Sequence, residues 1–256
     1  MSNLYRYGFP VSAPLSLAVL WISFCVPALA APANPILVEL FTSEGCSDCP
    51  PADALLKALD SAQPIPGAQL IVLEEHVDYW DDGGWRDPFS SHALTLRQSE
   101  YVDRLHVRNG PYTPQMVVDG SEVFVGSDRP QAGRAFAKEV SVPKISVQIS
   151  PVHVEGANAL AHIEIGAAPS KGEVFVAIAL DHAQSQVLRG ENGGRQLEHV
   201  AVVERLTSVG KVKKDEPFSK DVAIKMEHPE KDYRVIAFVQ QADDGKILGA
   251  AAAHAK

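Results

Sequence analysis

The chain has 256 residues, a formal net charge of −9 at pH 7 and a calculated pI near 5.4. No lysine or arginine cluster interrupts this acidic sequence, so we expect neither nucleic acid nor an anionic membrane surface as a partner. The length suffices for one large domain or for two ordinary ones.

Residues 1–30 have the pattern of an export signal. Arg6 is the only charged side chain, and an apolar stretch ends in Ala28-Leu29-Ala30, a small-x-small cleavage pattern. An uncleaved membrane anchor is the alternative, but Pro27 interrupts the stretch and a span needs about 20 apolar residues. We therefore expect cleavage after residue 30, loss of Cys25 with the signal, and a periplasmic or secreted product without stable membrane insertion.

Residues 31–141 alternate strand-like and helix-like segments. The expected strands are 36–41, 68–77, 115–119 and 122–125, and the expected helices are 52–59, 90–106 and 130–140. Asp119-Gly120 lies between two apolar runs and indicates a hairpin. The order β-α-β-α-β-β-α is that of the thioredoxin fold, so the sequence predicts an α/β thioredoxin-like domain over these residues.

From residue 142 to residue 256 the apolar residues alternate with period two, and no convincing helix interrupts them. The alternation is clearest at 145–149, 161–165 and 174–180. Short strands separated by turn residues predict an all-β, sandwich-like domain. Within it, Asn192-Gly193-Gly194 predicts a hairpin over the charged segment 188–199, with a contact surface as the alternative.

The most informative motif is Cys46-Ser47-Asp48-Cys49, between the first expected strand and the first expected helix. A helix N-terminus stabilises a thiolate through its unpaired N–H groups and its dipole. Exported proteins usually bridge distant segments with cysteines, whereas this closely spaced pair would stabilise the fold little. The pair therefore predicts redox chemistry in which Cys46, near an exposed turn, attacks and Cys49 resolves the mixed disulfide.

Zinc is a competing explanation for the two cysteines. A tetrahedral zinc site needs two further ligands at a comparable spacing, and the sequence has no second cysteine pair. The remaining histidines are scattered without a metal-ligand spacing. We therefore expect neither a metal nor another cofactor.

Tyr112-Thr113-Pro114-Gln115 precedes the expected hairpin and resembles the cis-proline segment of thioredoxins and glutaredoxins. A cis proline at this place would turn the backbone of the preceding residue toward the disulfide. Thr113 and Pro114 are then candidates for binding an extended substrate. The alternative is an ordinary trans proline that opens a strand.

Residues 76–89 follow the second expected strand and are rich in aromatic and charged side chains. In α/β sheets this edge usually carries the functional site, so we expect the loop to border the cysteines and to leave them partly open. Tyr79 and Trp80 are candidates for substrate binding, and His76 is a candidate proton carrier to Cys49. The alternative is a loop whose tryptophans fill space between domains.

Taken together, these motifs give the chain a resemblance to a bacterial family of exported thioredoxin-like proteins catalogued as domain of unknown function 1223. The segments that carry it are 38–53, 76–80, 84–89, 112–116 and Arg189-Gly190-Glu191-Asn192 with His199. The resemblance covers nearly all of the chain after residue 30. It implies the thioredoxin-like fold and leaves the activity open, because the role of the family is unsettled.

The function that we expect is exchange of disulfides with protein thiols or disulfides, supported by a redox donor protein. Asp48 places a negative charge between the cysteines, which opposes the thiolate and favours a reductase or isomerase over a strong oxidant. A copper(I) carrier that uses Cys46, Cys49 and His76 is one alternative, because thiolates suit that ion. An interaction protein with a vestigial disulfide is the other.

Overall fold

The computed structural model describes residues 1, 2, 4, 8 and 33–255, and residues 33–255 belong to one compact unit. Cys25 and all but four residues of the expected export signal lie outside the described residues. The helices are α1 (Pro50–Ala62), α2 (His92–Arg104) and α3 (Arg129–Glu139). The strands are β1 (Asn34–Thr42), β2 (Ala68–His76), β3 (Gln115–Val118), β4 (Glu122–Val125), β5 (Val147–Ile149), β6 (His153–Glu155), β7 (Asn158–Ile165), β8 (Gly172–Gln186), β9 (Gln196–Val212), β10 (Phe218–Lys225), β11 (Tyr233–Gln241) and β12 (Ile247–Ala255).

Eight strands form one mixed sheet in the order β12-β11-β8-β9-β2-β1-β3-β4. β1 and β2 run parallel, and both are mainly apolar and buried on both faces, as is typical of central strands. On its other side β2 pairs in parallel with β9, and Glu74 lies opposite Val202. Strands from both halves of the sequence therefore belong to the same sheet.

The expected thioredoxin-like domain with a separate β-sandwich behind it is wrong. The fold is mainly β, with 44% of residues in strands and 16% in helices, and the large sheet crosses the expected boundary at residue 141. The physical reason is the edge of β2, where backbone groups would otherwise lack partners. β9 covers this edge, and strand periodicity does not reveal which strand will do so.

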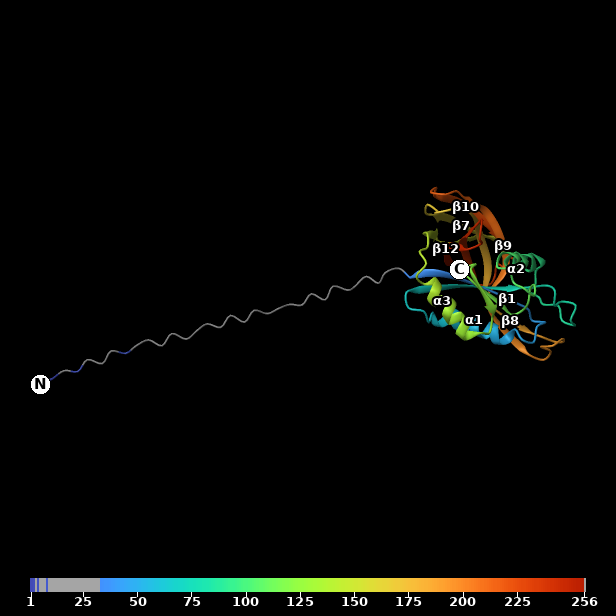
Figure 1. Ribbon diagram of the computed structural model, residues 1–256, viewed down its shortest axis with the longest axis horizontal. Helices are drawn as coiled ribbons and strands as arrows, with labels where there is room; N and C mark the ends of the chain where they lie inside the picture. Colours follow the sequence, from blue (N-terminus) through green and yellow to red (C-terminus); the bar gives the residue numbers. More distant parts are fainter. Residues whose placement is uncertain (3, 5–7, 9–32, 256) are drawn as a thin grey trace. The chain divides into compact units, whose positions relative to one another are not determined.

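A smaller sheet in the order β10-β7-β5, with β6 also paired to β7, packs against the β8–β9–β11–β12 part of the large sheet. Its apolar core includes Ile163 of β7 and Val176 of β8. Helices α1 and α3 cover a second core with Leu56, Phe136 and Phe238. In Figure 1 these two helices and the small sheet lie on opposite sides of the large sheet.

The helix ends follow from local sequence. Pro50 and Pro51 occupy the first positions of α1, where a proline loses no intrahelical hydrogen bond. Asp128 caps α3 by accepting a hydrogen bond from the backbone N–H of Gln131 at 2.9 Å. None of the helices in the part of the chain that the structure describes has the length and apolar character needed to cross a membrane.

The predicted Asp-Gly hairpin is confirmed by the antiparallel pairing of β3 and β4. Asp119 and Gly120 both have positive φ, of 49° and 62°, as a type I′ turn requires. A Cβ atom on Gly120 would lie only 2.1 Å from the carbonyl oxygen of Gly245. The hairpin is thus packed directly onto the turn before β12.

Two arginine side chains also connect the halves, one through an ion pair and the other through a hydrogen bond. Arg234 of β11 donates two parallel hydrogen bonds, of 2.6 and 2.8 Å, to the carboxylate of Asp60 on α1. The Arg97 guanidinium on α2 pairs with Glu39 of β1, where Nε lies 2.6 Å from Oε1, and its Nη1 donates to the Gln240 side chain at 3.5 Å. These contacts make the two halves one structural unit.

We predict that a chain truncated after residue 141 does not fold on its own. It would leave the β2 edge unpaired, and the buried Glu74 and Arg97 would lose His199 and Gln240, which at a buried site costs several kcal/mol. Thermal unfolding followed by near-UV circular dichroism checks this, with residues 33–255 as the control. A cooperative transition of the fragment close to that of the control would contradict the single-unit fold.

Candidate functional site

Cys46 and Cys49 lie between β1 and α1 and form a disulfide, with their Cα atoms 5.4 Å apart. Cys49 is the residue before the first turn of α1, so the pair lies at the positive end of the helix dipole. The cysteines themselves are not left partly open as expected, because Cys46 is only 2% exposed and Cys49 is fully buried. Only the intervening Ser47 and Asp48 are exposed.

Residues 187–195 cover residues 46–49, which we call the cysteine turn. They connect the antiparallel strands β8 and β9 and so confirm the predicted hairpin. The buried Asn192 side chain donates hydrogen bonds to the carbonyls of Glu44 (2.9 Å) and Cys46 (2.8 Å). Glu191 accepts the backbone N–H of Ser47 at 3.0 Å. We call residues 187–195 the covering loop, because they hold the cysteine turn from the other half of the sequence.

Residues 76–89, which we call the aromatic segment, lie against the cysteine turn on another side. A Cβ atom on Gly45 would come within 2.9 Å of Trp80, so the backbone before Cys46 is packed on this tryptophan. The Trp80 indole N–H donates to the Thr113 hydroxyl at 2.8 Å. Tyr79, by contrast, is 42% exposed.

The peptide bond between Thr113 and Pro114 is cis, as predicted. Pro114 and Ala52 both lie within 3.2 Å of the position that a Cβ atom on Gly126 would take. Pro114 therefore lies beside the first turn of α1, one turn beyond Cys49.

His76 takes a different place from the one expected. Its Nδ1 atom lies 2.7 Å from Asp87 Oδ2, and the same oxygen accepts the backbone N–H of Glu44 at 2.8 Å. Among the described residues no hydrogen bond joins His76 to either cysteine. The histidine thus supports the segment that leads into Cys46, and the structure gives it no direct route for a proton to Cys49.

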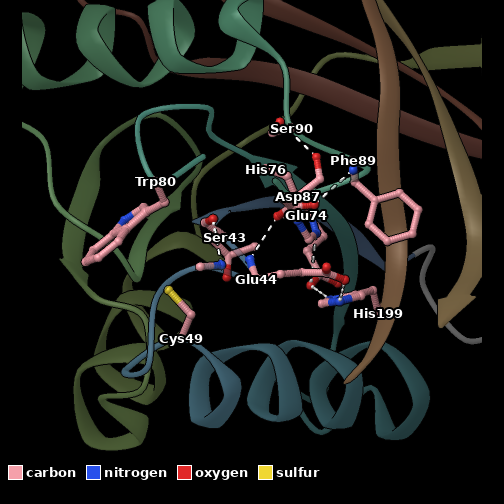
Figure 2. A network of polar contacts seen from close by, with 12 residues as sticks. Ser43, Glu44, Cys49, Glu74, His76, Trp80, Asp87, Phe89, Ser90 and His199 are labelled. Carbon is pink, nitrogen blue, oxygen red and sulfur yellow. Dashed lines mark hydrogen bonds and ion pairs between the residues drawn. The ribbon is translucent and has the colours of Figure 1, made fainter. Parts of the chain in front are cut away.

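His76 belongs to a buried group that we call the histidine–carboxylate cluster: Glu44, Glu74, His76, Asp87 and His199 (Figure 2). His199 Nδ1 lies 2.6 Å from Glu74 Oε1, and its Nε2 lies 3.3 Å from Glu44 Oε1. The two imidazole rings are 4.7 Å apart, edge to face. In Figure 2, Glu44 lies between Cys49 and His199, so the cluster is next to the disulfide.

Two further donors fix the orientation of the Glu44 carboxylate. The indole N–H of Trp85 donates to Oε2 at 2.7 Å, and the Ser185 hydroxyl donates to Oε1. Trp85 comes from the aromatic segment, whereas Ser185 comes from β8. Glu44 is therefore held by residues 76–89 on one side and by the end of β8, which leads into the covering loop, on the other.

Burial and neighbouring charges shift the pKa values of these groups in opposite directions. Burial alone would lower the pKa of His76, but the Asp87 carboxylate offsets this and raises it to about 9. Burial likewise opposes ionisation of Glu74, yet His199 beside it brings that pKa down to about 2. Burial, with Glu74 nearby, raises the pKa of Asp53 on α1 to about 7. The site therefore combines strongly ionised groups with one carboxyl that exchanges protons near neutrality.

Sequence reasoning missed the cluster apart from His76. A signal for part of it exists, because Glu74 and His76 are two residues apart on a strand and so share a face. Two polar side chains on the same face of an otherwise apolar buried strand require partners. His199 comes from β9, and no spacing in the sequence connects it to β2.

Comparison with known proteins gives the family. Residues 37–240 match the model of a family described as protein of unknown function (DUF1223). The chain belongs to this family. The match bears out the family resemblance and carries no thioredoxin-like attribution and no activity.

One solved structure resembles nearly the whole fold. It is the crystal structure of a protein from Agrobacterium tumefaciens, with 29% identity over 87% of this chain and 95% of that chain, at a TM-score of 0.67. The solution structure of a late embryogenesis abundant protein covers 49% of this chain and 78% of its own at 11% identity, and its TM-score of 0.31 is too low to inform the fold. No curated protein matches the chain.

We predict that Asn192→Ala lowers the free energy of unfolding by about 1–3 kcal/mol, because the change removes a buried side-chain donor from the carbonyls of Glu44 and Cys46. Urea denaturation of the oxidised protein measures this loss. Asn109→Ala is the matched control, since Asn109 is exposed. An equal effect of the two substitutions would show that the covering loop does not hold the cysteine turn.

Proposed function

We propose that this is an exported protein that exchanges disulfides with protein thiols or disulfides through Cys46 and Cys49. The observation that carries the proposal is the bonded pair at the start of α1, three residues apart and the only cysteines among residues 33–255. A short loop closed by a disulfide contributes little to stability, so chemistry is the better reason for such a bond. The positive end of the helix favours the thiolate that this chemistry needs.

In the reduced protein, the Cys46 thiolate attacks one sulfur of a substrate disulfide and releases the other substrate sulfur as a thiol. Cys49 then attacks Cys46 in the mixed disulfide, which restores the Cys46–Cys49 bond and releases the second substrate thiol. Two electrons pass to the substrate in each cycle. A redox donor protein returns them by reducing the Cys46–Cys49 bond, and no cofactor takes part.

Access is the step that the covering loop controls. Both cysteines are buried, and Asn192 and Glu191 are hydrogen-bonded to the turn that contains them. A substrate sulfur reaches Cys46 once these bonds open. The substrate would then contact the exposed Tyr79 together with Trp80 and Thr113, which are hydrogen-bonded to each other beside the turn. Pro114, next to Thr113, would contribute to the same surface.

The charge around the turn favours a reductase or isomerase. Asp48 is exposed between the two cysteines, and Glu191 is bonded to the adjacent Ser47 N–H. Negative charge close to Cys46 opposes its thiolate, which a strong oxidant would have to stabilise. Two carboxylates therefore favour transfer of electrons to the substrate.

The experiment that tests the proposal is trapping with Cys49→Ser. Without the resolving thiol, partner proteins should remain attached to Cys46 as mixed disulfides, visible as reducible bands on non-reducing gels of periplasmic and secreted extracts and identified by mass spectrometry. The double variant Cys46→Ser, Cys49→Ser is the control and should trap none.

Other outcomes distinguish the alternatives. An unreactive Cys46 together with tight copper(I) binding by the reduced wild type would favour the carrier. Neither adducts nor copper(I) binding would leave an interaction protein. Adducts that recur with the double variant would show that the attachment does not involve this pair.

A further inference from the structure

Disulfide exchange makes no direct use of Glu74, His76 and His199. Each of these residues offers one nitrogen or oxygen atom, and the three atoms lie within 4.8 Å of one another. Glu74 Oε1 lies 3.6 Å from His76 Nε2 and 2.6 Å from His199 Nδ1. Ligand atoms around a tetrahedral zinc ion are about 3.4 Å apart, so small side-chain shifts would accommodate an ion.

The Nε2 atom of His76 is an independent indication of a ligand. The residue is fully buried, and this nitrogen has no hydrogen-bond partner among the residues that the structure describes. The Nδ1 atom on the other side of the ring is occupied by Asp87. A buried polar atom without a hydrogen-bond partner destabilises the fold. The Nε2 atom of His76 lies on the side of the ring that faces the Glu74 carboxylate.

The surroundings also match those of a metal site. A histidine that binds a metal usually donates its other N–H to a carboxylate, which orients the ring and strengthens the ligand. His76 has Asp87 in this position, and His199 has Glu44 on its Nε2 side. Both imidazoles therefore have a carboxylate partner outside the set of three ligands.

The charge balance favours a cation. Three carboxyl groups contact the two imidazoles, and within residues 33–255 no lysine or arginine side chain forms an ion pair with Glu44, Glu74 or Asp87. Buried carboxylates need a compensating positive charge. The two imidazoles supply it when they are protonated, and a divalent ion supplies it when they bind as neutral ligands.

A cavity of about 410 Å³ gives a route to the cluster. Phe89 and Ser185 line it, and both touch the cluster: the Phe89 ring lies 5.4 Å from that of His76 and 5.7 Å from that of His199, while Ser185 donates to Glu44. Phe89 is only partly buried and lies beside both histidines in Figure 2. Rotation of this one ring would admit an ion from the cavity.

We propose that Glu74, His76 and His199 bind one divalent transition-metal ion, with zinc as the ion whose ligand preferences they fit best. Two imidazoles and a carboxylate are ligands that zinc takes in proteins. Water completes its coordination. This site is separate from the two cysteines and binds the ion while they are joined in their disulfide.

The test is calorimetric titration of the fully oxidised, tag-free protein with zinc chloride, and absorption spectroscopy with cobalt(II) as a coloured substitute. Oxidation removes the thiols as ligands. The wild type should bind one ion per chain, raise its Tm with zinc and give a cobalt spectrum without thiolate bands. His76→Gln and His199→Gln should abolish this binding, and Asp87→Asn should weaken it about 10–100-fold.

His162→Gln is the matched control, because His162 has the same contact to a carboxylate, 2.6 Å from Asp221, but lies in the small sheet. Circular dichroism verifies that each variant is folded. If a ligand variant fails to fold, Asp87→Asn and the wild-type cobalt spectrum decide. No binding by the oxidised wild type, or unchanged binding by a folded His76→Gln or Asp87→Asn, would overturn the proposal.

Discussion

The contact on which the rest of the structure depends is the one between Glu74 on β2 and the start of β9. One oxygen of the Glu74 carboxylate accepts a hydrogen bond from the backbone N–H of Val200 at 2.8 Å, and the other pairs with His199 at 2.6 Å. A buried carboxylate satisfied in this way fixes where β9 lies along β2. The large sheet is continuous because of this junction, and the covering loop reaches the cysteines because β9 starts here.

The cysteine turn is consequently an assembly of three distant segments. β1 and α1 supply the cysteines, the aromatic segment supplies Trp80 and Trp85, and the covering loop supplies Asn192. Each segment is bonded to the backbone or side chains of residues 43–47. The environment of the disulfide is therefore determined by the complete fold and by no single half of the sequence.

Local features could be predicted from the sequence because short-range physics determines them. The Asp119-Gly120 turn and the Asn-Gly-Gly connection each depend on residues within a few positions. The cis bond before Pro114 was expected from its resemblance to a known segment. The neighbour of β2 was not predictable, because apolar runs such as 200–203 fit several positions in a sheet equally well.

The candidate site likewise has one part that can be predicted from the sequence and one part that cannot. Cys46 and Cys49 are recognisable from spacing alone, whereas His199 joins Glu74 across 125 residues and leaves no local pattern. The expectation that the cysteines are left partly open is wrong for a related reason, since the residues that cover them are far along the chain. Burial by a remote segment cannot be read from the alternation of neighbouring residues.

The hydrogen bond from Ser47 to Glu191 spans 144 residues, so the cysteines are synthesised well before the loop that covers them. The cysteines leave the ribosome long before the covering loop exists, and N-terminal segments begin to fold first. Through that interval the two thiols are open to whatever oxidant or reductant the growing chain meets. Only the finished chain encloses them, so the first oxidation of the pair needs no opening of the covering loop, whereas every later exchange does.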